Sequence, residues 1–172
     1  MMKPRVLVAA LSVSAAAFGA LVTHEAYTDK AVIPTKGDRP TVGFGSTFDE
    51  KGAPVRMGDT ITPVQAVQRS LAHIAKDETR LKSCVTAPLS QGEYDVLVSF
   101  AYQYGSKVAC ESSVVRLINA QRYAEACDAY LLYKRAAGYD CSTLIDGEPN
   151  KRCWGVWERS LWRQRACLEA QP

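Results

Sequence analysis

The sequence predicts an α+β fold that is mostly α, with a small β-hairpin lobe packed on a helical lobe and a cleft between the two. Three observations lead to this prediction. Two short apolar runs flank a polar turn near residue 37, several capped helical segments follow, and the last segment is rich in tryptophan. The chain has 172 residues, of which 47% are hydrophobic, so a single domain can bury a sizeable core.

The amino terminus has the pattern of an export segment. Lys3 and Arg5 precede the uncharged stretch Val6 to Val22, which is rich in Ala, Ser and Gly. At about 1.5 Å per residue in a helix, this stretch is at the lower limit of what spans a bilayer core of about 30 Å. Three interpretations remain open: a cleaved signal peptide, a permanent anchor, or a weak span that can leave the membrane.

Retention of this segment is the interpretation that we favour. Cleavage after Ala17 or Ala20 would remove most of the helix that precedes Glu25. We therefore expect a signal-anchor segment over residues 1–23 and a folded domain over residues 24–172.

The next part of the chain predicts a β-hairpin with a wide loop. Residues 31–34 and 41–44 are short apolar runs, and Gly37 and Pro40 between them favour a turn. The segment 49–58 is polar and interrupted by Gly and Pro, so we expect a loop or a short third strand there.

Helical segments follow, and the first two have clear start signals. Thr62 is expected to cap a helix with Pro63 in its first turn. Ser90 and Glu93 form a capping box at the start of the next helix, which Gly105 ends. That second helix is so apolar that we expect it to be central. The expected buried stripe of the first helix is Val64, Val67, Leu71 and Ile74.

The carboxyl-terminal third predicts three more helices. Ser112 or Ser113 is expected to cap the first, and the second is expected over Tyr123 to Arg135. A polar loop over 139–152 leads to the last helix. Its apolar residues have helical spacing, which favours a core face over a sugar-stacking surface. These residues are Trp154, Trp157, Leu161 and Trp162.

Six cysteines behind an export segment indicate three disulfides in an oxidising compartment. The chain has no C-x-x-C pair with zinc-ligand spacing, so we expect neither a metal site nor a cofactor. Six cysteines allow fifteen pairings, and their positions do not decide among them. Our preferred pairing joins Cys141 to Cys153 across a short loop and leaves Cys84–Cys110 and Cys127–Cys167.

The net charge of +3 is too small to indicate a nucleic-acid partner. Part of the positive charge gathers near the last helix, where it either favours an anionic polymer such as a cell wall or forms an ordinary solvated face. The residues concerned are Lys151, Arg152, Arg159, Arg163 and Arg165.

Glu25 is the principal candidate for catalysis. It follows the apolar stretch almost directly, and sixteen residues later Thr41 opens the run Thr-Val-Gly-Phe-Gly. A carboxyl that is partly buried at the end of an apolar helix is expected to have a raised pKa and to stay protonated near neutral pH. The glycines would let a saccharide approach the backbone closely.

This layout resembles the phage-type lysozymes, or muramidases. In that family a Glu is followed by eight residues, then Asp or Cys, then five residues, then Thr before a Gly-x-Gly strand. Glu25 and Thr41 match the acid and the threonine, with one extra residue between them. The family's Asp position falls on Thr35, and Asp38 is the nearest acid in the turn. Either one is a candidate to position the attacking water, and Asp38 could instead bond its own backbone.

The resemblance extends over about residues 24 to 168. The run from Leu89 to Tyr102 is similar to the family's core helix, with Gln103 where Asn is common. The run from Glu158 to Arg165 resembles its closing helix. The resemblance implies a lysozyme-like fold and a peptidoglycan-cutting glycosidase that acts as a monomer on glycan strands, without a cofactor.

The export segment resembles that of the signal-arrest-release (SAR) endolysins of phages. In that family the segment directs export, tethers the enzyme to the inner membrane, and then escapes into the periplasm. In one branch of that family a cysteine in the segment drives activation by disulfide exchange. This segment contains no cysteine, so we expect activation by refolding of the released segment into the catalytic domain. The expected function is hydrolysis of the β-1,4 bond between N-acetylmuramic acid and N-acetylglucosamine, which lyses the host. The alternatives are a lytic transglycosylase and a non-catalytic, disulfide-stapled wall-binding protein.

Overall fold

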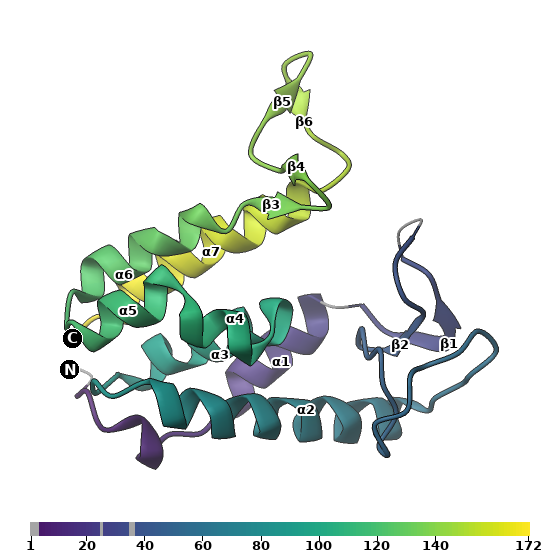
Figure 1. Cartoon of the computed structure of the whole chain (residues 1–172), viewed down its shortest axis with the longest axis horizontal. Coiled ribbons are helices and arrows are strands. Elements are labelled where there is room, and N and C mark those ends of the chain that lie inside the picture. Colours follow the sequence, from purple (N-terminus) through teal and green to yellow (C-terminus); the bar gives the residue numbers. More distant parts are fainter. Residues whose placement is uncertain (1–3, 25, 35–36) are drawn as a thin grey trace. The chain divides into compact units, whose positions relative to one another are not determined.

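The computed structural model of the chain describes residues 4–24, 26–34 and 37–172. They form two units, Val13–Glu78 and Met1–Ser12 with Thr79–Pro172. Each unit is described by itself below. Most elements are helices, and the strands form short antiparallel pairs, which confirms the predicted α+β class (Figure 1).

The unit Val13–Glu78 contains the predicted hairpin. Thr28 pairs with Gly43 and Val32 with Thr41 in an antiparallel arrangement. The first strand begins three residues before the expected position, because its other edge is also bonded. There Ala31 N–H donates to Asp59 O, and Asp29 O accepts from Ile61 N–H. The elements of this unit are α1 (Ala15–His24), β1 (Thr28–Val32), β2 (Thr41–Gly43) and most of α2 (Pro63–Cys84).

A small apolar core holds the hairpin against the start of α2. Phe44 packs on this core from the turn that follows β2. The segment 49–58 is a loop, as expected, and the Asp49 carboxylate stabilises it by accepting hydrogen bonds from Lys51 N and Ala53 N at 2.9 and 2.8 Å. The buried core residues are Ala31, Val42, Val55, Ile61 and Ala66.

The start of α2 is confirmed, and of its expected buried stripe Ile74 is buried, but Val64 and Leu71 are not. Thr62 Oγ1 accepts from Gln65 N, and Gln65 Oε1 accepts from Thr62 N in return, so the two residues form a capping box. Val64 and Leu71 are 67% and 44% exposed. The buried row contains small and polar residues, which a search for large apolar side chains passes over. It consists of Ala66, Ser70, Ile74, Asp77 and Leu81.

The other unit is built around α3 (Gln91–Tyr104), which is central as predicted. Its capping box between Ser90 and Glu93 is present, and Gly105 ends it. The helices α6 and α7 contact each other, and α7 also contacts α3 (Figure 1). The remaining helices are η1 (Val8–Ala10), α4 (Ser106–Glu111), α5 (Ser113–Asn119), α6 (Tyr123–Ala129), η2 (Tyr130–Leu132) and α7 (Trp154–Glu169).

An aromatic cluster explains why the helix expected over Tyr123 to Arg135 ends early. The Phe100 ring lies 5.4 Å from the ring of Tyr130 and 4.6 Å from that of Tyr133. The change from α6 to η2 brings both tyrosines onto Phe100. Burial raises the pKa of Tyr130 above its ordinary value, as expected for a phenol enclosed in a core.

Two short hairpins lie between α6 and α7, and the second falls inside the segment 139–152 that was expected to be a plain loop. Both have two-residue turns with positive φ, at Ala137–Gly138 and Asp146–Gly147. Asp-Gly is a strong hairpin signal that the sequence prediction missed. The strands are β3 (Arg135–Ala136), β4 (Tyr139–Asp140), β5 (Leu144–Ile145) and β6 (Glu148–Pro149).

The buried face of α7 also differs from the prediction. Ser160, Arg163 and Cys167 are buried, whereas the three tryptophans are only half-buried. Arg163 therefore does not belong to the surface basic group in which the sequence placed it. Its guanidinium donates to Ser99 O at 3.1 Å and to Gln103 Oε1 at 2.7 Å.

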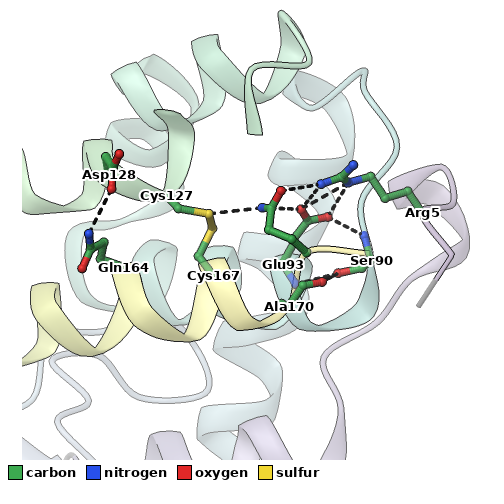
Figure 2. Close-up of a disulfide and its surroundings, with 9 residues drawn as sticks. Arg5, Ser90, Glu93, Cys127, Asp128, Gln164, Cys167 and Ala170 are labelled. Atoms are coloured by element: carbon green, nitrogen blue, oxygen red, sulfur yellow. Dashed lines mark hydrogen bonds and ion pairs between the residues drawn. A yellow bond between two sulfur atoms is a disulfide. The ribbon is translucent and has the colours of Figure 1, made fainter. Parts of the chain in front are cut away.

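The preferred disulfide pairing is confirmed. Cys127–Cys167 joins α6 to α7, and Figure 2 shows it next to the contact between Ser90 and Ala170. The Cα atoms of the three pairs lie 5.8, 5.4 and 5.1 Å apart, within the range of natural disulfides. The pairs are Cys84–Cys110, Cys127–Cys167 and Cys141–Cys153.

Gly92 provides a test of how closely the start of α3 packs on the end of α7. A Cβ at this position would lie 2.7 Å from Ala170 Cβ. Replacing Gly by Ala inside a helix ordinarily stabilises by about 1 kcal/mol, but overpacking costs about 1–3 kcal/mol. We therefore expect Gly92→Ala to lower the free energy of unfolding, as measured by urea denaturation.

The matched control is the double variant Gly92→Ala with Ala170→Gly, which removes the opposing methyl group. It should recover part of the lost stability. A single Gly92→Ala variant that is as stable as the original chain would contradict this packing.

Candidate active site

The structure describes two of the four predicted catalytic residues, Thr41 and Asp38. Glu25 and Thr35 lie outside the described residues. Thr41 is the first residue of β2 and is half-buried. Its Oγ1 donates to the carbonyl oxygen of Val32 across the hairpin, at 3.4 Å. The threonine is thus positioned by the strand pairing itself.

The Gly-Phe-Gly sequence after Thr41 forms a tight turn. Val42 and Ser46 pair through two backbone hydrogen bonds of 3.0 and 3.1 Å. Gly43 and Gly45 have φ values of 69° and 75°, a region that favours glycine. The backbone conformation therefore explains both glycines. The expected close approach of a saccharide to this turn stays a prediction.

Gly43 also permits a close approach between the hairpin and α2. A Cβ on Gly43 would lie 3.0 Å from the Cβ of Ala66, which is buried in the first part of the helix. This contact fixes the turn on the core of its unit. The position of Thr41, two residues earlier, depends on it.

The residues that directly follow Glu25 are also restrained. Tyr27 donates its hydroxyl to Ile61 O at 2.8 Å, and its ring lies 5.6 Å from that of Phe44. Ala26 has a φ of 49°, which is uncommon for a residue other than glycine and is strained. Sequence reasoning missed Tyr27 as a supporting residue. An aromatic two positions after the proposed acid was the available signal.

Asp38 lies in the exposed part of the hairpin loop. Its carboxylate makes no hydrogen bond to any residue that the structure describes, but residues 35 and 36 of the same turn lie outside those residues. Both interpretations of Asp38 therefore stay predictions. An exposed carboxylate of this kind is available to solvent and to a ligand.

In the other unit, Gln103 belongs to a polar cluster. It is the residue at the family's usual Asn position. Gln103 Oε1 accepts from Arg159 Nε at 3.0 Å and from a guanidinium nitrogen of the buried Arg163 at 2.7 Å. The amide oxygen is thus engaged by two cations of α7. Only the amide nitrogen is left to face other groups.

No group of three or more His, Cys, Asp or Glu side chains that could hold a metal ion occurs within residues 4–24, 26–34 and 37–172.

Comparison with known proteins identifies the family. The model of the phage lysozyme family matches residues 18–150, which include most of α1, the hairpin and the Thr41 turn. The chain belongs to the phage lysozyme family. This confirms the resemblance that the Glu25 and Thr41 pattern indicated.

Individual members of the family agree with this assignment. The endolysin of Salmonella phage P22 is 33% identical over 128 residues, which cover 74% of this chain and 83% of that protein. The SAR-endolysin of Pseudomonas phage phiKMV is 28% identical over 146 residues, which cover 84% of each chain. The structure of the endolysin from Escherichia coli O157:H7 phage FAHEc1 superposes with a TM-score of 0.76 at 24% identity, covering 95% of this chain and 98% of that one. The phage lysozyme fold predicted for this chain is therefore confirmed.

The Thr41 turn of this family member is tested by Gly43→Ala. A Cβ at a positive φ costs about 1–2 kcal/mol, and the contact with Ala66 adds overpacking of about 1–3 kcal/mol. We expect Gly43→Ala to lower the thermal unfolding midpoint and to reduce activity on peptidoglycan.

Gly52→Ala is the matched control, because Gly52 has a φ of 81° but no atom within 4 Å of an added Cβ. It should show the backbone strain alone and lose less stability than Gly43→Ala. Equal losses in the two variants would mean that the contact with Ala66 is unimportant.

Proposed function

We propose that this chain is an endolysin that hydrolyses the β-1,4 bond between N-acetylmuramic acid and N-acetylglucosamine in peptidoglycan. The observation that carries the proposal is the Thr41 turn, inside the region that matches the phage lysozyme family and sixteen residues after a glutamate. The reaction needs a proton donor and a group that positions water, and it needs no cofactor. Both groups are available in this part of the chain.

Glu25 is the proposed general acid. It follows His24, the last residue of α1, and the carbonyl end of a helix disfavours a nearby negative charge. This favours the protonated carboxyl that must donate to the leaving oxygen. The anchored Tyr27 and the strained Ala26 support the assignment, because restrained backbone is frequent beside reacting groups.

The second group is proposed to position the attacking water on the opposite face of the sugar. Thr41 is one part of it, since its hydroxyl is held at the start of β2. Either Thr35 or the exposed Asp38 supplies the other part. In an inverting glycosidase the acid and the base are about 6.5–9.5 Å apart, which leaves room for the water.

Glu25→Gln should abolish the degradation of peptidoglycan while leaving the fold and export unchanged. The glutamine keeps the size of the side chain but cannot donate the proton, so we expect a loss of about 10²–10⁴-fold. The measurement is the fall in turbidity of purified cell walls. Activity close to that of the original chain would rule out Glu25 as the acid.

The turbidity assay also identifies the group that positions the water, and mass spectrometry identifies the reaction type. Asp38→Asn and Thr35→Ala are compared, and the variant with the larger loss marks the residue that positions the water. Mass spectrometry of the fragments should show reducing ends, as hydrolysis requires. A 1,6-anhydro end would mean a lytic transglycosylase, and no cleavage at all would mean a wall-binding protein.

The amino-terminal segment is proposed to direct export and to tether the monomeric enzyme to the inner membrane before its release into the periplasm. Among the residues that the structure describes, no helix is long and apolar enough to cross a bilayer. In the fold Val8 and Leu11 are buried. Their burial supports retention of the segment, because cleavage after Ala17 or Ala20 would remove core residues.

Gly19→Leu should hold the protein in the membrane and delay lysis. A Cβ at Gly19 meets no atom within 4 Å, so the soluble fold tolerates a larger residue. Leucine favours insertion of a helix by about 0.3–0.6 kcal/mol on the insertion scale. Ser14→Leu is a poorer probe, because Ser14 Oγ caps α1 by accepting from Ala17 N.

Gly19→Gln is the matched control, with a side chain of similar size but polar. It should shorten the time that the protein stays in the membrane before release. The measurements are the time of lysis and the amount of protein in the membrane fraction, and identical values for the two variants would contradict release from a weak span.

A further inference from the structure

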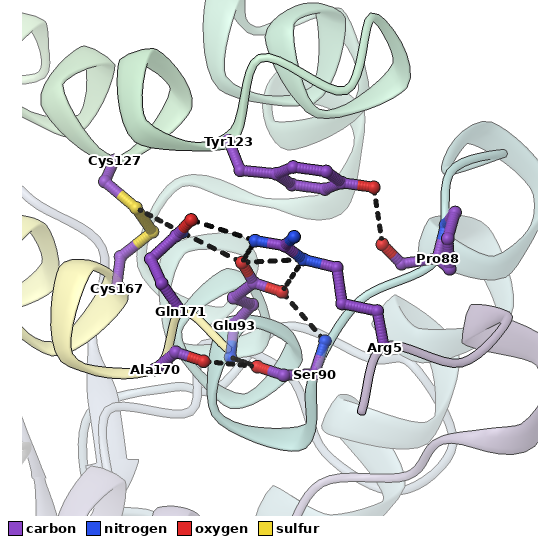
Figure 3. A network of polar contacts seen from close by, with 9 residues as sticks. All are labelled: Arg5, Pro88, Ser90, Glu93, Tyr123, Cys127, Cys167, Ala170 and Gln171. Atoms are coloured by element: carbon purple, nitrogen blue, oxygen red, sulfur yellow. Dashed lines mark hydrogen bonds and ion pairs between the residues drawn. A yellow bond between two sulfur atoms is a disulfide. The ribbon is translucent and has the colours of Figure 1, made fainter. Parts of the chain in front are cut away.

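The side chain of Arg5, which precedes the uncharged stretch Val6 to Val22, lies in a network around Glu93 (Figure 3). Arg5 Nε donates to Glu93 Oε2 at 2.9 Å, and Arg5 Nη2 donates to Glu93 Oε1 at 2.6 Å. Nη2 also donates to Gln171 Oε1 at 2.8 Å, and the guanidinium lies 3.5 Å from the centre of the Tyr123 ring. We call Glu93, Gln171 and Tyr123 together the Arg5 site.

The Arg5 site is held in place by other contacts. Tyr123 donates its hydroxyl to Pro88 O at 3.0 Å. Gln171 Nε2 donates to Glu93 Oε1 at 2.9 Å and lies 3.3 Å from Cys127 Sγ, beside the disulfide (Figure 3). The site therefore combines α3, α6 and the carboxyl terminus of the chain.

Glu93 needs a cation because its side chain is only 3% exposed. Besides Arg5 and Gln171, it accepts from Ser90 N at 2.8 Å as part of the capping box. These neutral donors satisfy some of its lone pairs but leave its charge uncompensated. A buried carboxylate without a cationic partner is costly, so the folded unit is most stable when Arg5 is docked.

The residues after Arg5 continue along the same unit and are not helical throughout. Val6 and Leu89 exchange two backbone hydrogen bonds of 2.8 Å. A short 3₁₀ turn, Val8–Ala10, follows, and Gln91 Nε2 donates to Ser12 O. The backbone of this stretch is thus bonded to the unit that contains α3.

A bilayer-spanning form of the same stretch would have to be a continuous helix, because a backbone in lipid must satisfy its hydrogen bonds internally. Basic residues ahead of such a helix stay on the cytoplasmic side. In the tethered state Arg5 and Glu93 would therefore be on opposite sides of a hydrocarbon core of about 30 Å. The docked and the membrane-spanning states exclude each other.

We propose that the Arg5 site is an intramolecular docking site that captures the released amino terminus and makes release directional. This proposal rests on the tether and release proposed above. The tethered form leaves Glu93 without its cation, and docking of Arg5 restores the pair and favours the periplasmic form. The export signal and the final fold thus share one arginine, which serves first as the flanking charge and then as the partner of Glu93.

The test uses the full-length chain, exported in host cells and fractionated into membrane and periplasm before lysis. Glu93→Gln removes the charge but keeps an acceptor for Ser90 N. We expect the ratio of periplasmic to membrane protein to fall at least about tenfold, which corresponds to about 1.4 kcal/mol. Glu125→Gln is the matched control, because Glu125 pairs with Arg122 at the surface of the same unit and does not contact Arg5. It should leave the ratio unchanged.

Arg5→Lys provides a second, independent arm. It keeps the flanking positive charge and all contacts of the capping box, but it loses the bidentate geometry. We expect a lower ratio in this variant and no further loss when it is combined with Glu93→Gln, since both remove the same interaction. This arm tests the docking even where Glu93→Gln does not fold.

Three outcomes would overturn the proposal. The ratio of periplasmic to membrane protein could be the same for Glu93→Gln and Glu125→Gln, or the effects of Arg5→Lys and Glu93→Gln on this ratio could add in the double variant. The third is that the original chain is never found in the membrane fraction. Peptidoglycan degradation by the soluble fraction is measured in parallel. An inactive original chain whose partition still depends on Glu93 would contradict the enzymatic function and support the docking. An active original chain whose partition between membrane and periplasm does not depend on Glu93 would support the enzymatic function and contradict the docking.

Discussion

The buried carboxylate of Glu93 is the constraint on which much of this structure depends. It caps the start of α3 through the capping box, accepts a hydrogen bond from Gln171, and pairs with Arg5. Burial makes each of these contacts more valuable, because little water is present to replace them. One side chain thus joins both ends of the chain to the central helix.

The candidate active site depends on backbone conformation more than on a set of converging charges. The turn after Thr41 requires two glycines at positive φ, and Gly43 lets the turn pack on Ala66. On the other side of Glu25, the strained Ala26 leads into the anchored Tyr27. The chain is therefore restrained on both sides of the sequence positions that carry the proposed chemistry, as preorganised catalysis requires.

The sequence correctly predicted those features that depend on interactions between residues close together in the chain. The cap at Thr62, the capping box at Ser90, the stop at Gly105 and the hairpin each involve residues within a few positions of one another, and all were confirmed. Prediction was largely wrong for the buried faces of α2 and α7, although Ile74 is buried as expected. There Ser70 and Arg163 are buried in place of larger apolar neighbours such as Leu71 and Trp162. Close packing and the partners of Arg163 set these faces, and no periodicity in the chain shows them.

By itself the sequence determined the family, the lysozyme-like fold class, the helix starts and the Glu25 and Thr41 pattern, because these depend on residue type and spacing. It left fifteen disulfide pairings open, and three-dimensional proximity selects one of them. Only the tertiary structure showed that Arg5 meets Glu93, 88 positions further along the chain. A contact over such a separation arises from packing of the whole unit, which a linear pattern of charges does not encode.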